Sequence, residues 1–336
     1  MRRAFFIVGP TATGKSELAA DVAREINAEI VSADAFQIYQ GLDLLTAKPH
    51  PSTLAKAPHH LIGTTPVSKD MNAEKYRRAA THAIDEINLR GKVAIIVGGS
   101  GLYVKALTHG LARLPASNPK LREKLNKISL DELRSKLEDL DPEAAEKIDT
   151  KNRRRVVCAL EICLVTGKPV SAQRSQWTVA ASLREARATA VMKARTSASH
   201  SEAATARAST IPATGVFVLR DREELYQRIN QRVEAMFEQG VIEEVRAAGA
   251  TSATASQVIG LRQIRQLLNG KMSLSQCIAE IQQATRRYAK RQLTWFRRQT
   301  SFLPLNLSLL SHNEARILLR MRAEPERVSE IHTTDD

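Results

Sequence analysis

The chain has 336 residues, of which 50 are Lys or Arg and 36 are Asp or Glu, so its formal net charge at pH 7 is +14. This length allows one large or two modest domains with a buried core. No apolar run approaches the ~20 residues that a membrane-spanning helix needs, and the first residues run straight into a strand pattern rather than a signal peptide. The sequence thus excludes a membrane-spanning protein and predicts a cytoplasmic one.

The strong positive charge favours a polyanionic partner, although a basic surface without a partner remains an alternative. Cys158, Cys163 and Cys277 form no C-x-x-C pair and have no histidine at metal-ligand spacing. We therefore expect reduced thiols, in agreement with a cytoplasmic location.

The first predicted element is a strand over residues 4–8, and it leads into a complete phosphate-binding loop. The loop matches G-x-x-x-x-G-K-[ST] and consists of Gly9, Pro10, Thr11, Ala12, Thr13, Gly14, Lys15 and Ser16. A helical pattern follows, so backbone N–H groups and the positive helix end converge on one place. The loop predicts a site for a diphosphate or triphosphate, in which Lys15 contacts the distal phosphate and the Ser16 hydroxyl binds Mg²⁺ as cofactor.

Three further apolar runs predict buried strands, at residues 29–31, 93–97 and 216–219. Helical patterns follow the first, third and fourth strands, and such alternation is typical of an α/β fold with a doubly wound parallel sheet. The four strands lead to residues 9–16, 32–34, 98–101 and 220–222. Because the carboxyl ends of parallel strands line the ligand crevice, we expect these segments to meet in one pocket.

The helical pattern changes in the middle of the chain. Leucines at helical spacing predict an inserted helical domain over residues 116–178, between the two parts of a phosphate-loop core at 1–115 and 215–310. Residues 179–214 are rich in Ala, Ser, Thr and Arg, and this composition predicts a disordered loop. Residues 311–336 are expected to form a tail, and His59-His60 a loop-packing pair without a catalytic role.

A basic helix is predicted over residues 281–298. Ile281, Tyr288 and Trp295 recur every seven residues, so we expect the two aromatic rings to belong to the core rather than to stack on bases. The cations on the rest of this helix, together with the run Arg153-Arg154-Arg155, suggest phosphate contacts with a nucleic acid. A solvated charged face is the alternative.

A phosphate loop alone suggests a kinase or an NTPase. Such enzymes commonly place a magnesium-binding acid at the end of an apolar strand, but here residues 93–97 lead into glycines. The only well-placed carboxylate is Asp34, which follows the strand at 29–31. It could bind Mg²⁺, accept a proton or cap a helix, and its position alone does not decide among these roles.

Several ordered blocks between residues 4 and 298 resemble the tRNA dimethylallyltransferase family. They are the loop at 9–16, Ser32–Asp34 with Gln37 and Tyr39, Gly41–Pro49, Pro58–Ile62, Gly98–Tyr103, Ala159–Glu161 with Thr166–Pro169, Asp221–Leu225, and Ala289–Phe296. The resemblance implies transfer of a dimethylallyl group from dimethylallyl diphosphate to the exocyclic amine of the adenosine 3′ of the anticodon. The tRNAs concerned would read codons that start with U, and diphosphate would be released.

The resemblance also implies roles for individual residues. Asp34 would be the general base, Thr11 would donate to the bridging oxygen, and Arg222 would be a second cation for the diphosphate, unless it forms only a surface ion pair. The positions implied to contact the anticodon stem-loop of tRNA are Asp34, Ala35, Phe36, Gln37, Ser100, Arg122, Arg154 and Arg155. For Arg122 a solvated helix face is equally compatible with the sequence. A monomer that binds one tRNA is the simplest expectation.

Some positions depart from the family pattern. Ala35 replaces a serine, Leu45 a glycine, Cys158 an arginine and Leu261 an aromatic residue, and the 179–213 loop is longer than usual. Three other functions remain open: a relative that prenylates free adenine nucleotides, a phosphate-loop nucleoside or nucleotide kinase, and a catalytically silent tRNA-binding relative. The basic helix and the helical insertion argue against the first, and the missing acid after residue 97 against the second. The intact Asp34, Lys15 and Arg222 argue against the third.

Overall fold

The computed structural model describes residues 3–111, 115, 117–173 and 214–324. The chain divides into two units, each considered by itself: residues 1–108 with 210–336, and residues 109–209. Residues 179–213 of the predicted disordered loop lie outside the described part of the chain.

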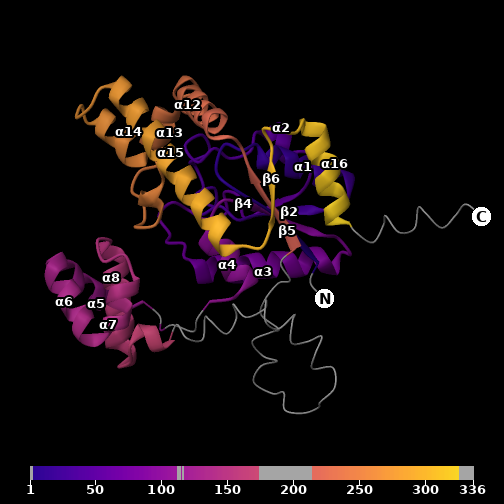
Figure 1. The fold of residues 1–336 in the computed structure, drawn as a ribbon. Helices are drawn as coiled ribbons and strands as arrows, with labels where there is room; N and C mark the ends of the chain where they lie inside the picture. The colour runs from indigo at the N-terminus through magenta and orange to yellow at the C-terminus, as the bar shows by residue number, and fades with distance from the viewer. Residues whose placement is uncertain (1–2, 112–114, 116, 174–213, 325–336) are drawn as a thin grey trace, which may run out of the picture. The chain divides into compact units, whose positions relative to one another are not determined.

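A parallel sheet forms the centre of the first unit (Figure 1). Its strand order within the described residues is β3-β2-β4-β1-β5-β6, and every neighbouring pair is parallel. The strands are β1 (Ala4–Val8), β2 (Glu29–Ser32), β3 (His59–His60), β4 (Ala94–Gly98), β5 (Thr214–Leu219) and β6 (Leu303–Asn306).

Helices cover both faces of this sheet. Phe5 and Ile7 of β1 face α1 (Lys15–Glu25) and α16 (His312–Ala323), whereas Phe6 and Val8 face the cluster that contains α3 (Ala73–Leu89), α4 (Gly101–Thr108) and α15 (Leu274–Gln299). A strand that is buried on both faces must be apolar throughout, which explains the unbroken runs AFFIV and AIIVG. The doubly wound α/β fold predicted from the sequence is confirmed.

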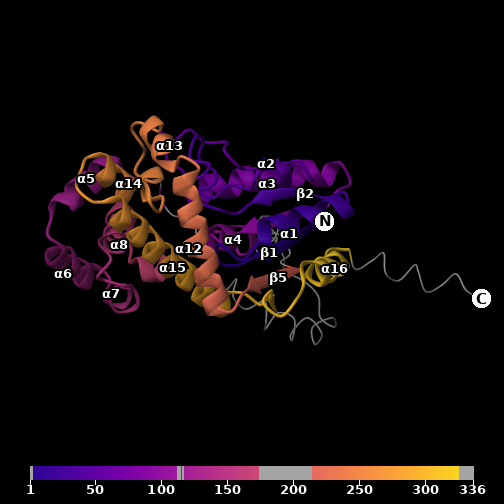
Figure 2. The ribbon, with the colours of Figure 1, turned by 90° about the horizontal axis from the view of Figure 1, so that it is seen from above.

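The remaining helices of the first unit follow β2 and β5 in the chain. They are α2 (Pro51–Leu54), α12 (Arg222–Glu238), α13 (Val241–Ala247), a 3₁₀ turn (Ala255–Gln257) and α14 (Leu261–Leu268). Helices α12 and α15 run side by side (Figure 2). No helix of the described residues is both long enough and apolar enough to cross a membrane.

The strand register brings the predicted segments to one edge of the sheet. Val8 of β1 pairs with Gly98 of β4 and with Phe217 of β5, and Ser32 of β2 pairs with Val97. A side chain at Gly98 would place its Cβ atom 2.2 Å from the carbonyl oxygen of Ala33, so only glycine fits there. The strands β1, β2, β4 and β5 therefore end level with one another, next to the phosphate loop.

Three elements differ from the sequence prediction. The predicted tail contains α16, which begins at a capping box of Ser311 and Glu314 and buries Ala315, Leu319 and Ala323. These apolar positions include two alanines, so the helical pattern is weak. The pair His59-His60 forms β3, and residues 303–306 form β6; β3 is too short, and β6 too interrupted by proline, to show an apolar pattern.

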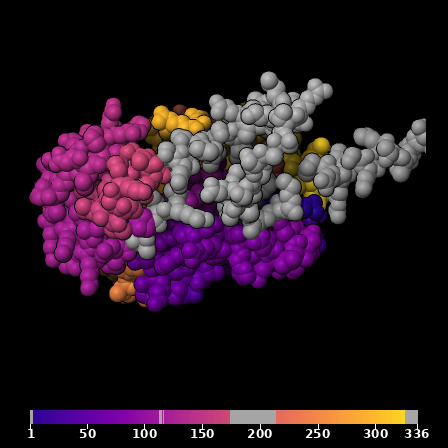
Figure 3. Space-filling model, turned by 90° about the horizontal axis from the view of Figure 1, so that it is seen from below, coloured from indigo at the N-terminus to yellow at the C-terminus, as the bar shows by residue number. Residues whose placement is uncertain are grey.

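The second unit is a bundle of four short helices within its described residues. They are α5 (Pro119–Lys127), α6 (Leu130–Leu140), α7 (Pro142–Lys147) and α8 (Arg153–Thr166). Each begins after a side chain that accepts a backbone N–H of the first turn, and these caps are Asn118, Ser129, Asp141 and Asn152. The helices share a core that includes Leu125, Leu133, Leu137, Val156 and Leu160, and they form one body in magenta and pink in Figure 3. They fall within the range 116–178 that the sequence assigned to an insertion.

Candidate functional site

The phosphate loop follows β1 and ends at the first turn of α1. A side chain at Gly9 would place its Cβ atom 2.2 Å from the carbonyl oxygen of Val218, and Gly14 has a left-handed φ of 90°. Both positions therefore require glycine. The Thr13 hydroxyl and the Lys15 amine each donate to the carbonyl oxygen of Pro10, at 3.1 Å. The loop is thus a preformed turn with Lys15 folded over it.

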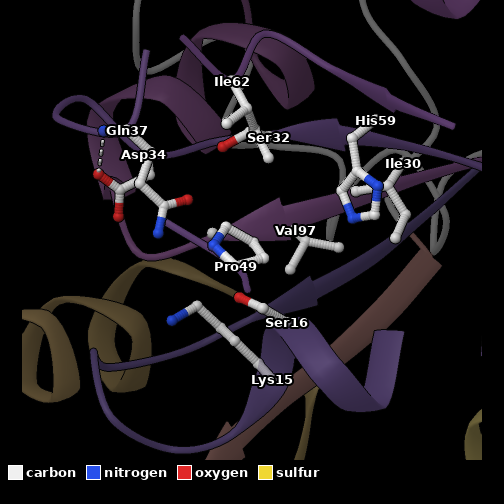
Figure 4. A pocket seen from close by; sticks show the side chains of 11 residues that line it. Lys15, Ser16, Ile30, Ser32, Asp34, Gln37, Pro49, His59, Ile62 and Val97 are labelled. Atoms are coloured by element: carbon white, nitrogen blue, oxygen red, sulfur yellow. Dashed lines mark hydrogen bonds between the residues drawn. The ribbon is translucent and has the colours of Figure 1, made fainter. Parts of the chain in front are cut away.

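One pocket contains this loop and the end of β2 (Figure 4). Lys15 and Ser16 rise from the start of α1, and Asp34 and Gln37 come from the loop after β2. The pocket is lined by Lys15, Ser16, Ile30, Ser32, Asp34, Gln37, Pro49, His59, Ile62, Val97 and Gly98. The structure therefore brings four residues that the sequence singled out, Lys15, Ser16, Asp34 and Gln37, to a common cavity.

Asp34 is fixed through one of its two carboxylate oxygens. Its Oδ1 accepts the backbone N–H groups of Phe36, at 2.9 Å, and Gln37, at 3.3 Å. The neighbouring Ala35 N–H donates to Ser100 Oγ at 2.8 Å, which ties the turn to the end of β4. Among the described residues, no hydrogen bond reaches Asp34 Oδ2. Asp34 therefore caps its own turn and still presents one free oxygen for chemistry.

Neutral tyrosines surround this carboxylate. Burial raises the pKa of Tyr76, Tyr103 and Tyr288 above its usual value, and the negative charge of Asp34 raises each further. The rings of Tyr76 and Tyr103 stack with their centroids 3.8 Å apart, and the ring of Phe36 lies 5.9 Å from that of Tyr288. Tyr288 thus belongs to the site rather than to the core alone, whereas Trp295 packs against the core as expected.

The cations of the site influence one another. Burial lowers the pKa of Lys15 to about 8, while Asp34 raises it and Arg232 lowers it. Burial also lowers the pKa of Arg232 to about 10, although Asp34 raises it. A buried cation is more favourable when an anion is near. The site is therefore electrostatically suited to a bound anion such as diphosphate.

Three arginines that the sequence analysis did not single out contact the phosphate loop. Arg220 Nε donates to the carbonyl oxygen of Thr13 at 2.8 Å, and Arg228 Nε donates to that of Ala12 at 2.9 Å. Arg232 Nη1 donates to the Thr11 hydroxyl at 2.8 Å. These arginines and the intervening Glu224 recur every four residues, which places them on one face of α12 and its approach. That spacing is the sequence signal that would have identified them.

The expected contact between Arg222 and the diphosphate stays a prediction. Arg222 is exposed at the first turn of α12, and its guanidinium group lies over the Tyr226 ring, 5.2 Å from the centroid. The loop contacts of the described structure come instead from Arg220, which precedes α12, and from Arg228 and Arg232 within it.

Gln292 of α15 connects two segments of the site. Its Oε1 accepts the backbone N–H of Thr11 at 2.9 Å, and its Nε2 donates to the carbonyl oxygen of Gly99 at 2.9 Å. The buried face of α15 at this point consists of Thr285, Ala289, Gln292 and Phe296. An amide on that otherwise apolar stripe is a sequence signal for a buried polar role, and the sequence analysis missed it.

Gln37, one of the positions implied to contact tRNA, is partly engaged within the protein. Its Nε2 donates to the carbonyl oxygen of Ala47 at 2.8 Å.

Leu45, a departure from the family pattern, is buried, and its Cδ1 lies 2.8 Å from where the Cβ atom of a side chain at Gly260 would be. The larger side chain is therefore accommodated against a glycine.

The three arginines implied to contact tRNA, Arg122, Arg154 and Arg155, belong to the second unit. Arg122 forms an ion pair with the buried Glu161, whose Oε2 lies 2.7 Å from Arg122 Nη2 and 2.8 Å from Arg122 Nε. Glu161 Oε1 also accepts the backbone N–H of Asn118. Arg122 therefore contributes to the structure of its own unit, and a contact with RNA stays a prediction. Arg154 and Arg155 are exposed on the first turn of α8.

The donor set of the pocket fits Mg²⁺ that arrives with a phosphate ligand. Within the described residues there is no cluster of three or more His, Cys, Asp or Glu side chains that could bind a metal. The pocket instead offers the Ser16 hydroxyl, for which no described residue is a hydrogen-bond partner, and Asp34 Oδ2. Mg²⁺ commonly takes one or two protein oxygens and completes its shell with phosphate oxygens and water.

Proteins of a known family are similar to this chain over most of its length. The family model described as "IPP transferase" matches residues 37–299. The chain is 39% identical over 295 residues to "tRNA dimethylallyltransferase" of Akkermansia muciniphila, covering 88% of this chain and 90% of that one. It is 41% identical over 292 residues to "tRNA dimethylallyltransferase 1" of Citrifermentans bemidjiense, covering 86% and 87%.

Solved structures are similar as well. The crystal structure of the full-length tRNA isopentenylpyrophosphate transferase from Bacillus halodurans matches with a TM-score of 0.66 at 29% identity, and covers 99% of this chain and 100% of that one. A eukaryotic dimethylallyltransferase acting on tRNA matches with a TM-score of 0.72 over 98% of this chain and 80% of that one; at 23% identity this likeness concerns the fold alone.

Proposed function

This chain belongs to the IPP transferase family, and we propose that it is a tRNA dimethylallyltransferase. It transfers the dimethylallyl group of dimethylallyl diphosphate to the exocyclic amine of the adenosine 3′ of the anticodon, in tRNAs that read codons starting with U. The proposal is supported above all by one observation. Lys15 and Ser16 of the phosphate loop and Asp34 line the same pocket, so a leaving diphosphate and an activated amine can meet there.

The chemistry assigns a role to each side of the pocket. The bond between the allyl C1 and the bridging oxygen breaks, and its electron pair leaves with the diphosphate. The adenine N6 forms the new bond to C1 and loses one proton, which Asp34 Oδ2 accepts as general base. Lys15 and the loop N–H groups stabilise the charge that accumulates on the diphosphate.

The loop geometry makes this stabilisation available before the reaction. The arginine contacts to the carbonyl oxygens of Ala12 and Thr13 fix the conformation of the loop. Thr11 donates to the bridging oxygen. When Mg²⁺ is bound by the Ser16 hydroxyl and the substrate, it supplies further stabilisation of the leaving diphosphate.

The RNA partner is proposed from charge. The net charge of +14 favours a polyanion, and Arg287, Lys290 and Arg291 are exposed on α15. Arg154 and Arg155 present two more exposed cations on the second unit. The target adenosine must leave its stack to enter the pocket. A monomer in the cytoplasm completes the proposal, and the three cysteines are free thiols, as expected there.

Mass spectrometry of tRNA nucleosides tests the proposal. Unmodified tRNA, dimethylallyl diphosphate and Mg²⁺ are incubated with the protein, and an added five-carbon unit on adenosine is expected. The Asp34→Asn variant should lower the rate by about 10²- to 10⁴-fold, the usual contribution of a general base. Asp139→Asn, at an exposed aspartate of α6, is the matched control and should keep the rate.

Each other outcome identifies a different function. Tight tRNA binding without added mass would reject the transfer and indicate a silent binding relative. ATP turnover without RNA would indicate the kinase, and transfer to free adenine nucleotides but not to tRNA would indicate the nucleotide-prenylating relative.

A further inference from the structure

Arg220 joins three separate segments of the chain through one guanidinium group. Its Nε donates to the carbonyl oxygen of Thr13 in the phosphate loop, at 2.8 Å. Its Nη1 donates to Glu224 Oε1 on the first turn of α12 and to the carbonyl oxygen of Leu307, just after β6. Only 18% of the Arg220 side chain is exposed. Because a guanidinium group is a rigid, planar fork of donors, it holds these three partners in one geometry.

The contact with Thr13 determines where the next N–H group of the loop points. The peptide bond between Thr13 and Gly14 is trans and planar, so its C=O and N–H point in opposite directions. Arg220 holds the carbonyl oxygen on its own side and thereby orients the Gly14 N–H. Among the described residues, no atom accepts this N–H. It is one of the loop N–H groups that are available to a bound phosphate.

Ser308 keeps the partners of Arg220 in place. Its Oγ accepts the backbone N–H of Asp221, at 2.9 Å, and donates to Glu224 Oε2. Glu224 therefore uses one carboxylate oxygen for Ser308 and the other for Arg220. The backbone of Leu307 continues the pairing of β5 with β6. The position of Arg220 thus depends on two residues that lie outside the pocket.

The same C-terminal segment also packs against the helix that follows the phosphate loop. Helix α16 lies beside α1 (Figure 1), and the two share one core cluster. His312 Nε2 at the start of α16 lies 2.9 Å from Asp21 Oδ2 of α1. Since α1 begins with Lys15, residues 303–323 support the loop from both flanks, through Arg220 on one side and through α1 on the other.

Arg220 needs this support because its surroundings disfavour a cation. Burial lowers the pKa of Arg220, and the positive charge of Arg228 lowers it further, whereas Glu224 raises it. A buried cation beside a second cation is stabilised by its carboxylate partner. Loss of the bond between Ser308 and Glu224 should therefore loosen Arg220 as well, and with it the Thr13 carbonyl.

We propose that Arg220 is a positioning residue that fixes the Gly14 N–H toward the bound diphosphate, and that the C-terminal segment keeps it in place through Ser308. The inference rests on the proposed function, because it takes the anion in the loop to be the diphosphate of the donor substrate. Arg220 orders the loop before the substrate arrives, so the bound substrate and the transition state are stabilised alike. Its loss should therefore raise KM for the donor more than it lowers kcat.

Calorimetric titration with inorganic diphosphate and Mg²⁺ tests the inference without tRNA. Arg220→Met keeps the length of the side chain but removes its donors, and it should weaken the affinity by about 10-fold or more, as for loss of a charged hydrogen bond. Ser308→Ala should weaken it by about 3- to 10-fold. The double variant should match Arg220→Met within about twofold, because Ser308 acts through Arg220.

Two comparisons separate positioning from charge and from a loosened fold. Arg220→Lys keeps the charge but not the fork, so it should bind diphosphate nearly as weakly as Arg220→Met. The affinity for tRNA in the absence of donor should stay unchanged in all three variants, whereas a loosened fold would weaken both ligands. The matched controls are Arg246→Met, at an exposed arginine of α13, and Ser301→Ala, at an exposed serine before β6.

The opposite results would overturn the inference. Full diphosphate affinity in Arg220→Lys would mean that charge alone suffices, and multiplying effects of Arg220→Met and Ser308→Ala would mean that the two residues act separately. If Arg220→Met fails to fold, Ser308→Ala still decides: an affinity equal to that of Ser301→Ala means that the C-terminal segment does not act on the loop. A wild-type protein that binds diphosphate but modifies no tRNA would reject the proposed function alone.

Discussion

Replacing Gln292 tests whether α15 fixes the phosphate loop. In the Gln292→Leu variant the side chain keeps its bulk but loses both of its hydrogen bonds, one to the Thr11 N–H and one to the Gly99 carbonyl oxygen. The Gly99 carbonyl group is buried next to the buried Gln292 side chain, whereas the Thr11 N–H is half-buried. Leucine leaves little space for a water molecule to replace the amide.

The expected loss follows from the number of groups left without a partner. A buried donor or acceptor that loses its partner costs about 1–3 kcal/mol. Counting the buried Gly99 carbonyl in full and the half-buried Thr11 N–H at about 1 kcal/mol, the two groups together cost about 2–4 kcal/mol. Since a factor of ten corresponds to about 1.4 kcal/mol, the local opening of the loop should become about 30- to 1,000-fold more frequent. The transfer rate should fall too, because the loop no longer has one geometry.

Hydrogen exchange measured on peptides that contain residues 9–16 is the suitable assay, because it reports local opening in a chain of two units where a single unfolding midpoint is not well defined. Gln283→Leu on the exposed face of the same helix is the control and should leave exchange in the loop unchanged. Equal exchange of the loop in the Gln292→Leu and Gln283→Leu variants would refute the argument that Gln292 holds the loop.

Two pH-dependent predictions follow from buried charges. Burial lowers the pKa of Lys15 to about 8 in the free protein, and the pKa rises when an anion binds, so the affinity of the wild-type protein for inorganic diphosphate relative to that of Lys15→Arg should be constant below about pH 8 and decrease above it; calorimetric titration of both proteins tests this, because the titration of diphosphate itself cancels in the ratio. Burial alone would raise the pKa of Glu29. The hydrogen bonds from Arg90, His60 and Lys92 outweigh burial and lower this pKa from 4.5 to about 2. Its stabilising effect is therefore present above the ordinary value of 4.5 and is lost as the pH falls toward 2. Glu29→Gln should lower the free energy of local opening around β2 by about 1–3 kcal/mol near pH 7, because Arg90 is half exposed and its attraction is screened by solvent; hydrogen exchange of peptides that contain β2 measures this difference, and a difference that persists unchanged near pH 2 would contradict the argument.

Local patterns predicted the framework of the site. The strands before the loop and before Asp34 are continuous apolar runs, and the loop motif is a contiguous set of residue types with one structural meaning. The sequence alone therefore places Lys15, Ser16 and Asp34 at one edge of the sheet. The tail helix α16 could not, because its buried positions include two alanines, which carry little hydropathy signal.

The contacts that shape the loop could not be predicted in this way. Arg228, Arg232 and Gln292 contact residues 216, 221 and 281 positions away in the chain. Their residue types are common on exposed helix faces, and only the packing of α12 and α15 against the loop decides which of many cations is buried. Arg222, which the family resemblance favoured, begins α12 and is exposed over Tyr226, whereas Arg220, just before the helix, contacts the loop.

These contacts join the two halves of the proposed reaction. Gln292 connects Thr11 to Gly99, the next residue Ser100 accepts the Ala35 N–H, and Ala35 adjoins Asp34. The donor side and the acceptor side of the pocket are therefore linked through hydrogen bonds between the end of β4 and α15. Because positional catalysis depends on the separation of the reacting groups, a change at Gln292 should alter the alignment of base and leaving group together.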